Sequence, residues 1–443
     1  MVNTGGTTCV VVGGGPAGMV LGLLLARAGV AVTVLEKHAD FLRDFRGDTV
    51  HASTLTLLDE LGLGKRFAAL PQRRLDRARV QLDGGAVQVA DLSRLPGAHR
   101  HIAMVPQWDF LDLLADAAAE EPTFTLVRNA EVVGLMRAGG SVSGVRYRNR
   151  VDGTEHALRA TLTVACDGRA SAVRAAAGLR PRSFGVPMDI WWFRLPRRPE
   201  DPEGGVGRIT TGAMAVMIDR GDYWQCAYVI RKGSDAAVRA EGVAAFRDRV
   251  TRLLPWVADR VGAIGSLDDV KLLDVRLERL RRWYRRGLLL VGDAAHAMSP
   301  VGGVGINLAV ADAVAAARIL APALRRGGPV PVAVLRRVQL RRWWPTALIQ
   351  AVQRLAHRLV LGRALRAEHE PRPAAPAAPV ALGGTGGTPA DPSGLPLPLR
   401  MLQRFPALQA VPARLIAIGP LPEHAPTWAR RTPLPVAPAP PGR

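Results

Sequence analysis

The first forty residues alternate between strand-like and helix-like runs of apolar side chains. Val10–Val12 and Val30–Leu35 are short apolar runs, and each predicts a buried strand. Between them lie a glycine-rich turn and an apolar stretch, Pro16–Ala26, of helical length. This order predicts the strand–helix–strand unit that begins a Rossmann-like α/β domain.

Apolar spacing predicts further elements along the rest of the chain. Trp108–Ala119 is amphipathic, with Phe110, Leu111 and Leu114 on one side of a predicted helix. Aromatic, strand-like segments between residues 184 and 280 predict a second sheet lying over the first domain. The expected helices cover residues 51–63, 108–119, 236–254, 307–324 and 332–366, and the expected strands cover 78–91, 125–128, 130–137, 144–148, 160–165, 189–195, 207–218, 223–230 and 288–291.

A formal net charge of +21 raises the question of nucleic-acid binding. Only four of the 59 basic residues are lysines, and the arginines are scattered along the chain in short clusters. We therefore expect no nucleic-acid partner. The charge instead favours small anionic ligands, including a phosphorylated nicotinamide cofactor such as NADP.

One segment reaches the length of a membrane span. Cys9–Ala26 contains no charged residue over eighteen positions, but five glycines and a proline interrupt it and no basic segment precedes it. We therefore expect no integral membrane segment, and a cytoplasmic protein that is a monomer or homodimer. The three cysteines are far apart and lack metal-ligand spacing, so we expect no metal site.

The turn after the first strand carries a dinucleotide-binding pattern. Gly13 allows the tight turn, Gly15 lets a pyrophosphate approach the backbone, and Gly18 lets the helix pack close to the strand. The helix start at Pro16-Ala17 offers N–H groups to the phosphates. Glu36 ends the second strand, followed by Lys37, and is placed to accept hydrogen bonds from ribose hydroxyls.

Two more glycine turns follow predicted strands. They are Asp167-Gly168 and Gly292-Asp293, and the second leads into the glycine-rich loop Gly302–Asn307 and a long helix. Ligands of open α/β sheets bind beyond the carboxyl ends of the strands, so all three turns are expected to meet at one site.

These three motifs, in this order, resemble the FAD-dependent aromatic hydroxylases of the para-hydroxybenzoate hydroxylase type. The resemblance covers residues 8–330. It rests on the first glycine turn, on Asp167–Arg174, and on Gly292–His296 with Pro300 and Gly302–Ala309. It implies bound FAD, and NAD(P)H as a co-substrate.

The resemblance also implies roles for individual residues. Asp293 would bind the ribitol hydroxyls, Arg46 and Gln107 would hold the ribose and ribitol regions, and Asp167 would serve both cofactors. Pro300 and Gly303 would lie beside the reacting ring, with Gly168, Gly292, Gly305, Ile306 and Asn307 completing the FAD contacts. Two positions depart from the family pattern, since Val304 and Ile306 stand where many relatives have Gln and Met. His296 is open to two interpretations, a base or a structural histidine.

The predicted architecture is a Rossmann-like FAD-binding domain interleaved with a β-sheet substrate domain, plus C-terminal helices. Residues 1–183 form the first part of the FAD-binding domain, and residues 184–280 form the substrate sheet. Residues 281–366 return to the FAD-binding domain and its long helices. Residues 367–396, rich in Pro, Gly and Ala, are expected to be a flexible linker, and 397–443 to be a docking segment and tail.

The implied reaction is hydroxylation of an aromatic or other electron-rich, bulky organic substrate by O2 through a flavin C4a-hydroperoxide, as in secondary metabolism. Trp192, Arg194, Met214 and Trp224 are the candidate substrate residues, with Arg194 as an anchor for an acidic group. Few charges among these strands indicate an apolar substrate.

Three alternatives stay open on the same residues: a flavin reductase or oxidase, a flavin halogenase, and a flavin-binding or basic interaction protein without catalysis. Trp191–Pro196 is near a halogenase tryptophan motif but lacks its spacing.

Overall fold

A parallel sheet forms the centre of the larger domain. The computed structural model describes residues 4–42, 49–358 and 397–432. Five strands run parallel in the order β20-β11-β1-β2-β8, and β19 joins at the edge, antiparallel to β20. The strands are β1 (Thr4–Val12), β2 (Val32–Leu35), β8 (Phe124–Val127), β11 (Glu155–Ala165), β19 (Tyr284–Arg285) and β20 (Leu288–Leu290). The parallel sheet confirms the α/β prediction.

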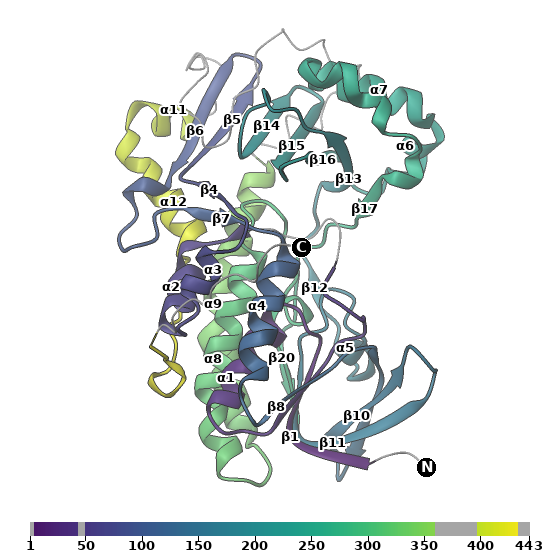
Figure 1. Ribbon diagram of the computed structural model, residues 1–443, viewed down its shortest axis with the longest axis vertical. Coiled ribbons are helices and arrows are strands. Elements are labelled where there is room, and N and C mark those ends of the chain that lie inside the picture. Colours follow the sequence, from purple (N-terminus) through teal and green to yellow (C-terminus); the bar gives the residue numbers. More distant parts are fainter. Residues whose placement is uncertain (1–3, 43–48, 359–396, 433–443) are drawn as a thin grey trace, which may run out of the picture.

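Helices cover one face of this sheet. An antiparallel hairpin, β9–β10, extends β11 and lies on the opposite face. Figure 1 shows α1, α4, α8 and α9 stacked alongside the sheet, with the second sheet above them. Their bounds are α1 (Pro16–Arg27), α4 (Gln107–Ala119), α8 (Gly305–Arg325) and α9 (Val332–Ala356); β9 (Ala130–Ala138) and β10 (Ser141–Asn149) extend β11. By length and composition alone α8 is able to cross a membrane, but 67% of its most apolar window is buried inside the protein, as expected of a core helix.

The second sheet contains more of the chain than the predicted block 184–280. Its order is β17-β13-β16-β15-β14-β5-β6, so β5 and β6, which lie before residue 184, belong to it. The strands are β5 (Arg77–Leu82), β6 (Gly85–Asp91), β13 (Met188–Pro196), β14 (Gly205–Thr210), β15 (Ala213–Asp219), β16 (Tyr223–Arg231) and β17 (Lys271–Leu273). The strand expected over 207–218 is therefore a hairpin, β14–β15, with its turn at Thr211-Gly212.

Helices α6 (Asp235–Ala240) and α7 (Gly242–Leu253) lie beside the second sheet (Figure 1). The sequence predicts one helix over 236–254, but Gly242 has a φ of +84°, which breaks the helix at that point. Phe246, Val250 and Leu253 of α7 pack against the sheet.

Short elements lie around and between the two sheets. They are β3 (Thr49–Val50), β4 (Arg73–Leu75) and β7 (Ile102–Met104), which pair in the order β3-β7-β4; β12 (Arg182–Ser183) paired with β18 (Glu278–Arg279); α2 (Ala52–Glu60), α3 (Gly64–Ala68) and α5 (Ala172–Ala176); and the 3₁₀ segments η1 (Leu92–Arg94), η2 (Pro255–Ala263), η3 (Leu267–Asp269) and η4 (Gly292–Ala294).

The C-terminal segment returns to the body of the molecule. It forms α11 (Leu397–Arg404), η7 (Pro406–Gln409), α12 (Ala410–Ala417) and η8 (Thr427–Ala429). Ala413 and Ala417 of α12 are fully buried in one cluster with Ala90 and Leu92, so α12 packs on the body of the molecule. Arg46, the predicted linker 367–396 and the tail 433–443 lie outside the described residues.

Candidate cofactor and active site

The three glycine turns begin at the same edge of the central sheet. Val12 of β1 lies in register with Ala165 of β11, and Ala165 lies in register with Leu290 of β20. Backbone hydrogen bonds continue past these residues, from Cys166 N to the Val12 carbonyl (2.7 Å) and from Val291 N to the Ala165 carbonyl (3.0 Å). Segments more than a hundred residues apart in sequence therefore form one site, as predicted from the strand ends.

Three of the glycines pack directly against other parts of the protein. A Cβ on Gly13 would lie 2.6 Å from the Cys166 carbonyl oxygen, and one on Gly18 would lie 1.9 Å from the Gly13 oxygen. A Cβ on Gly292 would lie 3.2 Å from the Ala309 Cβ and 3.5 Å from the Ala17 Cβ. Larger residues would push these segments apart, so the glycines hold the three turns in contact.

Three other glycines face open space. A Cβ on Gly15, Gly168 or Gly305 would meet no heavy atom within 4 Å. Gly15 and Pro16 begin α1, and Gly305 begins α8, so two helix starts present N–H groups there. A space that Cβ atoms would fill, bounded by helix N-termini, fits an extended dinucleotide such as FAD.

Glu36 lies at the end of β2, beside the first turn. Its Oε2 accepts a hydrogen bond from Gly14 N (2.8 Å), and its Oε1 accepts one from His38 N (3.1 Å). The carboxylate is thus fixed next to the glycine turn, in the position expected for binding ribose hydroxyls. The neighbouring Lys37 side chain is exposed.

Asp293 follows the third turn and lies beside the second. Its carboxylate is one-third exposed, and Arg169 Nε lies 3.6 Å from it. The buried Arg174 donates from Nη1 to the Ala294 carbonyl (3.1 Å). Arg169 and Arg174, which follow the second glycine turn, therefore contact Asp293 and the backbone next to it, and hold Asp293 at the edge of the site.

The Asp167 carboxylate accepts hydrogen bonds from the first residues of α5 and from the residue before it. Its Oδ1 accepts from the Ser171 hydroxyl (2.5 Å) and its Oδ2 from Val173 N (3.1 Å). Burial raises the pKa of this carboxyl, and these hydrogen bonds oppose the rise. The carboxylate caps α5, so a role in cofactor binding stays a prediction.

The loop before α8 is held by contacts to the β3 segment. Gly303 N donates to the Pro300 carbonyl (3.0 Å), and the Thr49 hydroxyl donates to the Gly303 carbonyl (3.2 Å). Gly303 has a φ of +64°, and a Cβ there would lie 2.8 Å from Thr49 Oγ1. Gln107 begins α4 just after β7, which pairs with β3. Ile306 is half-buried in the first turn of α8.

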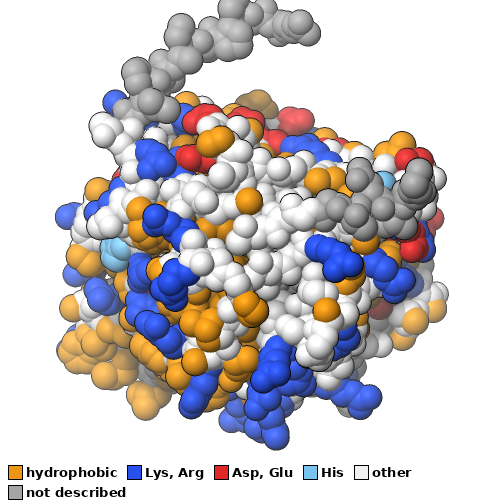
Figure 2. All heavy atoms as spheres, turned by 90° about the horizontal axis from the view of Figure 1, so that it is seen from below, with side chains coloured by type: hydrophobic (Ala, Val, Ile, Leu, Met, Phe, Trp, Pro, Cys, Tyr) orange, Lys and Arg blue, Asp and Glu red, His pale blue; other side chains and the backbone are white. Residues whose placement is uncertain are grey.

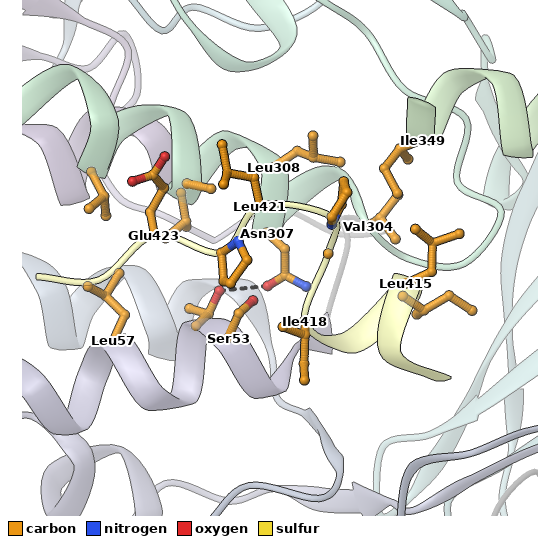
Figure 3. Close-up of a pocket in the computed structure, with 18 of the residues that line it drawn as sticks. Ser53, Leu57, Val304, Asn307, Leu308, Ile349, Leu415, Ile418, Leu421 and Glu423 are labelled. Carbon is orange, nitrogen blue, oxygen red and sulfur yellow. Dashed lines mark hydrogen bonds between the residues drawn. The ribbon is translucent and has the colours of Figure 1, made fainter. Parts of the chain in front are cut away.

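Asn307 connects α8 to α2. Its Oδ1 accepts from the Thr54 hydroxyl (2.6 Å), the bond dashed in Figure 3, and from His51 N (3.4 Å). The Asn307 side chain, predicted to contact FAD, is thus engaged on the α2 side of the helix.

His51 is a residue that the sequence analysis missed. Its side chain is fully buried, and Nδ1 lies 2.9 Å from the Ile416 carbonyl, which accepts only, so Nδ1 carries the proton. Nε2 has no hydrogen-bond partner among the described residues and lies 3.4 Å from where a Cβ on Gly303 would be. Burial lowers the pKa of His51 to about 4, which leaves it neutral. No local signal marks this position, because Ile416 is far along the chain.

A buried ionic network lies behind the third turn. Asp312 Oδ2 accepts from Gly292 N (3.1 Å) and His296 Nε2 (2.5 Å), and its Oδ1 accepts from Arg342 Nε (3.0 Å). Arg342 Nη1 lies 3.4 Å from the buried Glu423 carboxylate. Burial alone would raise the pKa of Asp312, but His296 and Arg342 outweigh it and lower the pKa. The contact with Asp312 favours the interpretation of His296 as a structural histidine.

The face of the second sheet that carries Trp192 and Met214 packs against the loop before α8. These two side chains, Val216 of β15 and Val301 of the loop all pack against one buried cluster, which consists of Met188, Ile190, Ala227, Val229 and Val275. Trp192 and Met214 therefore lie on the same face of this sheet, and their contact with substrate stays a prediction. Val216 was not singled out beforehand, although its spacing from Met214 puts it on the same face.

Trp224 is placed on the opposite face, which corrects the prediction. It is fully buried in the cluster with α7, and its Nε1 donates to Asp201 Oδ2 (2.9 Å). Strand alternation separates the two faces, but only the position of α7 shows which face is covered. Arg194 is exposed at the far end of β13, with its guanidinium 4.7 Å from the Tyr223 ring centroid.

A separate small pocket lies behind α8, between α2, α9 and the C-terminal segment (Figure 3). Val304, Leu308, Ile349 and Leu415 make its lining mostly apolar, with Asn307 and Glu423 at its wall. Of the α8 residues, Asn307, Val310, Ala311 and Val314 line this pocket, whereas Ala309 lies against the third turn at Gly292.

Comparison with known proteins identifies a family. The model of the FAD-binding domain family matches residues 6–331. The chain is 35% identical over 322 residues to 6-methylpretetramide 4-monooxygenase of Streptomyces rimosus, covering 72% of this chain and 76% of that enzyme. It is 26% identical over 365 residues to 3-demethoxyubiquinol 3-hydroxylase of Escherichia coli, covering 78% and 88% of the two chains.

Solved structures share the fold. The crystal structure of P. aeruginosa PqsL in complex with 2-aminobenzoylacetate has a TM-score of 0.67 at 22% identity, covering 81% of this chain and 97% of that one. OxyS anhydrotetracycline hydroxylase from Streptomyces rimosus has a TM-score of 0.68 at 24% identity, covering 93% and 76%.

Proposed function

The chain belongs to the family of FAD-dependent aromatic monooxygenases, and on this basis we propose that it uses NAD(P)H and O2 to hydroxylate a bulky aromatic substrate. It is an FAD-dependent hydroxylase. One observation carries the proposal. Gly15, Gly168 and Gly305 all face open space, and Val301 of the loop before Gly305 packs against the apolar cluster of the second sheet.

FAD, when bound, supplies the redox chemistry of hydride acceptance and oxygen transfer. The residues of this chain bind and orient it. Gly15 and the start of α1 would receive the pyrophosphate, Glu36 the adenosine ribose, and Asp293 the ribitol hydroxyls. The start of α8 would direct its N–H groups toward the ring, where negative charge develops.

Trp192, Met214 and Val216 would exclude water from the reacting centre and contact the substrate. Their apolar character supports a bulky, apolar substrate, and similarity to 6-methylpretetramide 4-monooxygenase supports a role in secondary metabolism. We also propose a cytoplasmic location, where NAD(P)H is available and the three free cysteines stay reduced.

The test begins with the purified chain. We expect it to be yellow with a flavin spectrum, and to oxidise NAD(P)H faster when a suitable phenol, indole or quinone is added. Oxygen from ¹⁸O2 should then appear in the product. A reductase or oxidase would oxidise NAD(P)H without oxygen insertion, and a halogenase would require halide.

Substitution of Asp293 tests the cofactor assignment separately. Asp293→Ala should remove most of the bound FAD, because buried ribitol hydroxyls would lose their acceptor. Asp152→Ala, at an exposed turn between β10 and β11, is the matched control and should keep full flavin content. Full flavin content in Asp293→Ala would contradict the assignment.

A further inference from the structure

Exposed apolar side chains are concentrated in two segments of this protein. Of the sixteen large hydrophobic side chains that are exposed among the described residues, seven lie on α9 and five lie between residues 397 and 411. Scattered exposed hydrophobic residues are ordinary, but a concentration of this kind marks an interaction surface.

The exposed residues of α9 form a stripe separate from its buried side. Leu335, Val338 and Ile349 face the core and are buried. Leu340, Trp344, Leu348 and Leu355 follow one another at helical spacing and are 42–58% exposed, with Trp343 beside them at 41%. The helix is therefore apolar on its outer side as well, although its inner side already completes the core.

The C-terminal segment carries further exposed apolar side chains. Met401, Phe405, Leu408 and Val411 are 40–65% exposed. Ile349 of α9 packs in one cluster with Leu415 and Ile416 of α12, so the two segments meet. At its lower left, Figure 2 shows hydrophobic side chains gathered together with Lys and Arg side chains. We call the exposed apolar residues of 340–355 and 401–411 the α9–α12 face.

The charge of both segments has one sign. Residues 332–358 contain six arginines and no Asp or Glu, and residues 397–418 contain three arginines and no Asp or Glu. Two of the six, Arg341 and Arg342, pair with Glu423, which leaves four for the surface. Arg336 and Arg337 precede the apolar stripe, and Arg354 and Arg358 lie at its end; all four are exposed. If this surface bound the same surface of a second copy, arginines would face arginines. The like charges would repel, which disfavours such a dimer.

We propose that the α9–α12 face docks the enzyme onto the surface of an anionic lipid bilayer. A helix lying on a bilayer combines an apolar side with Trp, which prefers the interface, and flanking Arg, which binds anionic headgroups. The inner side of α9 stays packed on the protein, so the helix lies on the bilayer and does not cross it. The proposal does not depend on the reaction that the enzyme catalyses.

Vesicle binding by the full chain loaded with FAD tests this. Vesicles of phosphatidylglycerol and phosphatidylcholine in equal parts should sediment the protein, and phosphatidylcholine alone should not. Raising the salt from 50 to 500 mM should weaken the binding, because headgroup attraction is screened. Tryptophan fluorescence should shift to shorter wavelength on binding.

Double variants test whether vesicle binding depends on this face or on other exposed apolar residues. W343S combined with W344S should weaken vesicle binding by roughly tenfold or more, since two interfacial side chains are lost. V133S combined with V151S changes exposed residues at β9 and at the turn after β10, and should bind as the wild type does. If the tryptophan variant loses flavin or thermal stability, R336Q combined with R337Q replaces it, with a smaller expected loss.

Several results would overturn the proposal. One is absence of binding to the anionic vesicles at 50 mM salt, and another is unchanged binding by both the tryptophan and the arginine variants. A dimer in light scattering that W343S with W344S dissociates would assign the face to a second copy. Capture of an acidic protein by this face, with no affinity for vesicles, would assign it to a protein partner.

Discussion

The two ends of the proposed FAD site are built in different ways. At the pyrophosphate end, residues 9–36 provide strand, turn, helix and acid in a single stretch, and Glu36 bonds directly to Gly14. At the ring end, the loop before α8 is held by Thr49, while His51 is held by Ile416, 365 residues away in sequence. The first end depends on local geometry, and the second depends on contacts between distant segments.

The difference extends to the kind of interaction at each end. Close backbone packing at glycines shapes the pyrophosphate end. Buried polar groups shape the ring end, where Asp312, Arg342 and Glu423 connect the third turn to the C-terminal segment. A local motif can thus be recognised from sequence, whereas a polar network requires the folded chain. Four predictions test this comparison.

The largest expected effect is from Arg342→Met. The substitution leaves the buried carboxylates of Asp312 and Glu423 without their shared partner, at a cost of about 3–5 kcal/mol. A thermal melt should show a fall in Tm of roughly 3–5 °C. Arg341→Met is the control: it also removes an ion pair with Glu423, but Arg341 is 38% exposed, so about 1 kcal/mol or less is expected. Equal losses would show that burial of the network is unimportant.

The next effect is the pH dependence that His51 contributes. In the folded protein its pKa is about 4, below the ordinary 6.5, so the unfolded chain binds a proton that the folded chain refuses. The stabilisation is fully present above pH 6.5 and is lost as the pH falls toward 4, by about 3 kcal/mol.

Urea unfolding at pH 7, 5.5 and 4.5 measures this contribution. His51→Gln should lose less stability than the wild type across that range, because glutamine has no titrating group there. His424→Gln, on the exposed C-terminal segment, is the control and should follow the wild type. Identical pH profiles for His51→Gln and the wild type would mean that this histidine is not buried in its neutral form.

Two glycine substitutions at the pyrophosphate end distinguish an effect on stability from an effect on FAD binding. Gly18→Ala should cost about 1–3 kcal/mol or more, since its Cβ would lie 1.9 Å from the Gly13 carbonyl oxygen. Gly15→Ala meets no protein atom within 4 Å and should leave Tm unchanged while weakening FAD binding about tenfold, by crowding the pyrophosphate. Melting curves and flavin fluorescence titrations distinguish the two; the reverse order of Tm values would contradict the packing argument.

The smallest effect is expected from Glu36→Gln. The amide oxygen can still accept from Gly14 N, so the turn should remain intact. The loss of the negative charge should weaken FAD by about 1 kcal/mol, roughly fivefold. Glu131→Gln on β9 is the exposed control. A large fall in Tm for Glu36→Gln would mean that the carboxylate supports the fold more than the ligand.

Much of the site followed from local sequence patterns. The strand ends predicted that the three turns meet, and the register of Val12, Ala165 and Leu290 confirms it. Alternation along a strand separates its two faces, but does not say which face of the second sheet α7 covers. Trp224 was therefore assigned to the wrong face. The participation of β5 and β6 in the second sheet was missed because strand pairing between residues 81 and 208 has no local signal.

The amino-acid sequence was enough to specify the βαβ start and the glycine turns, because these depend on residues close together or on steric demands that only glycine meets. The order of the three turns along the chain pointed to the FAD family. The folded chain was needed to assign the covered face of the second sheet and the neutral state of His51, and to favour a structural role for His296. Burial and hydrogen bonding arise only when distant segments pack together, and they set the energy of each polar group.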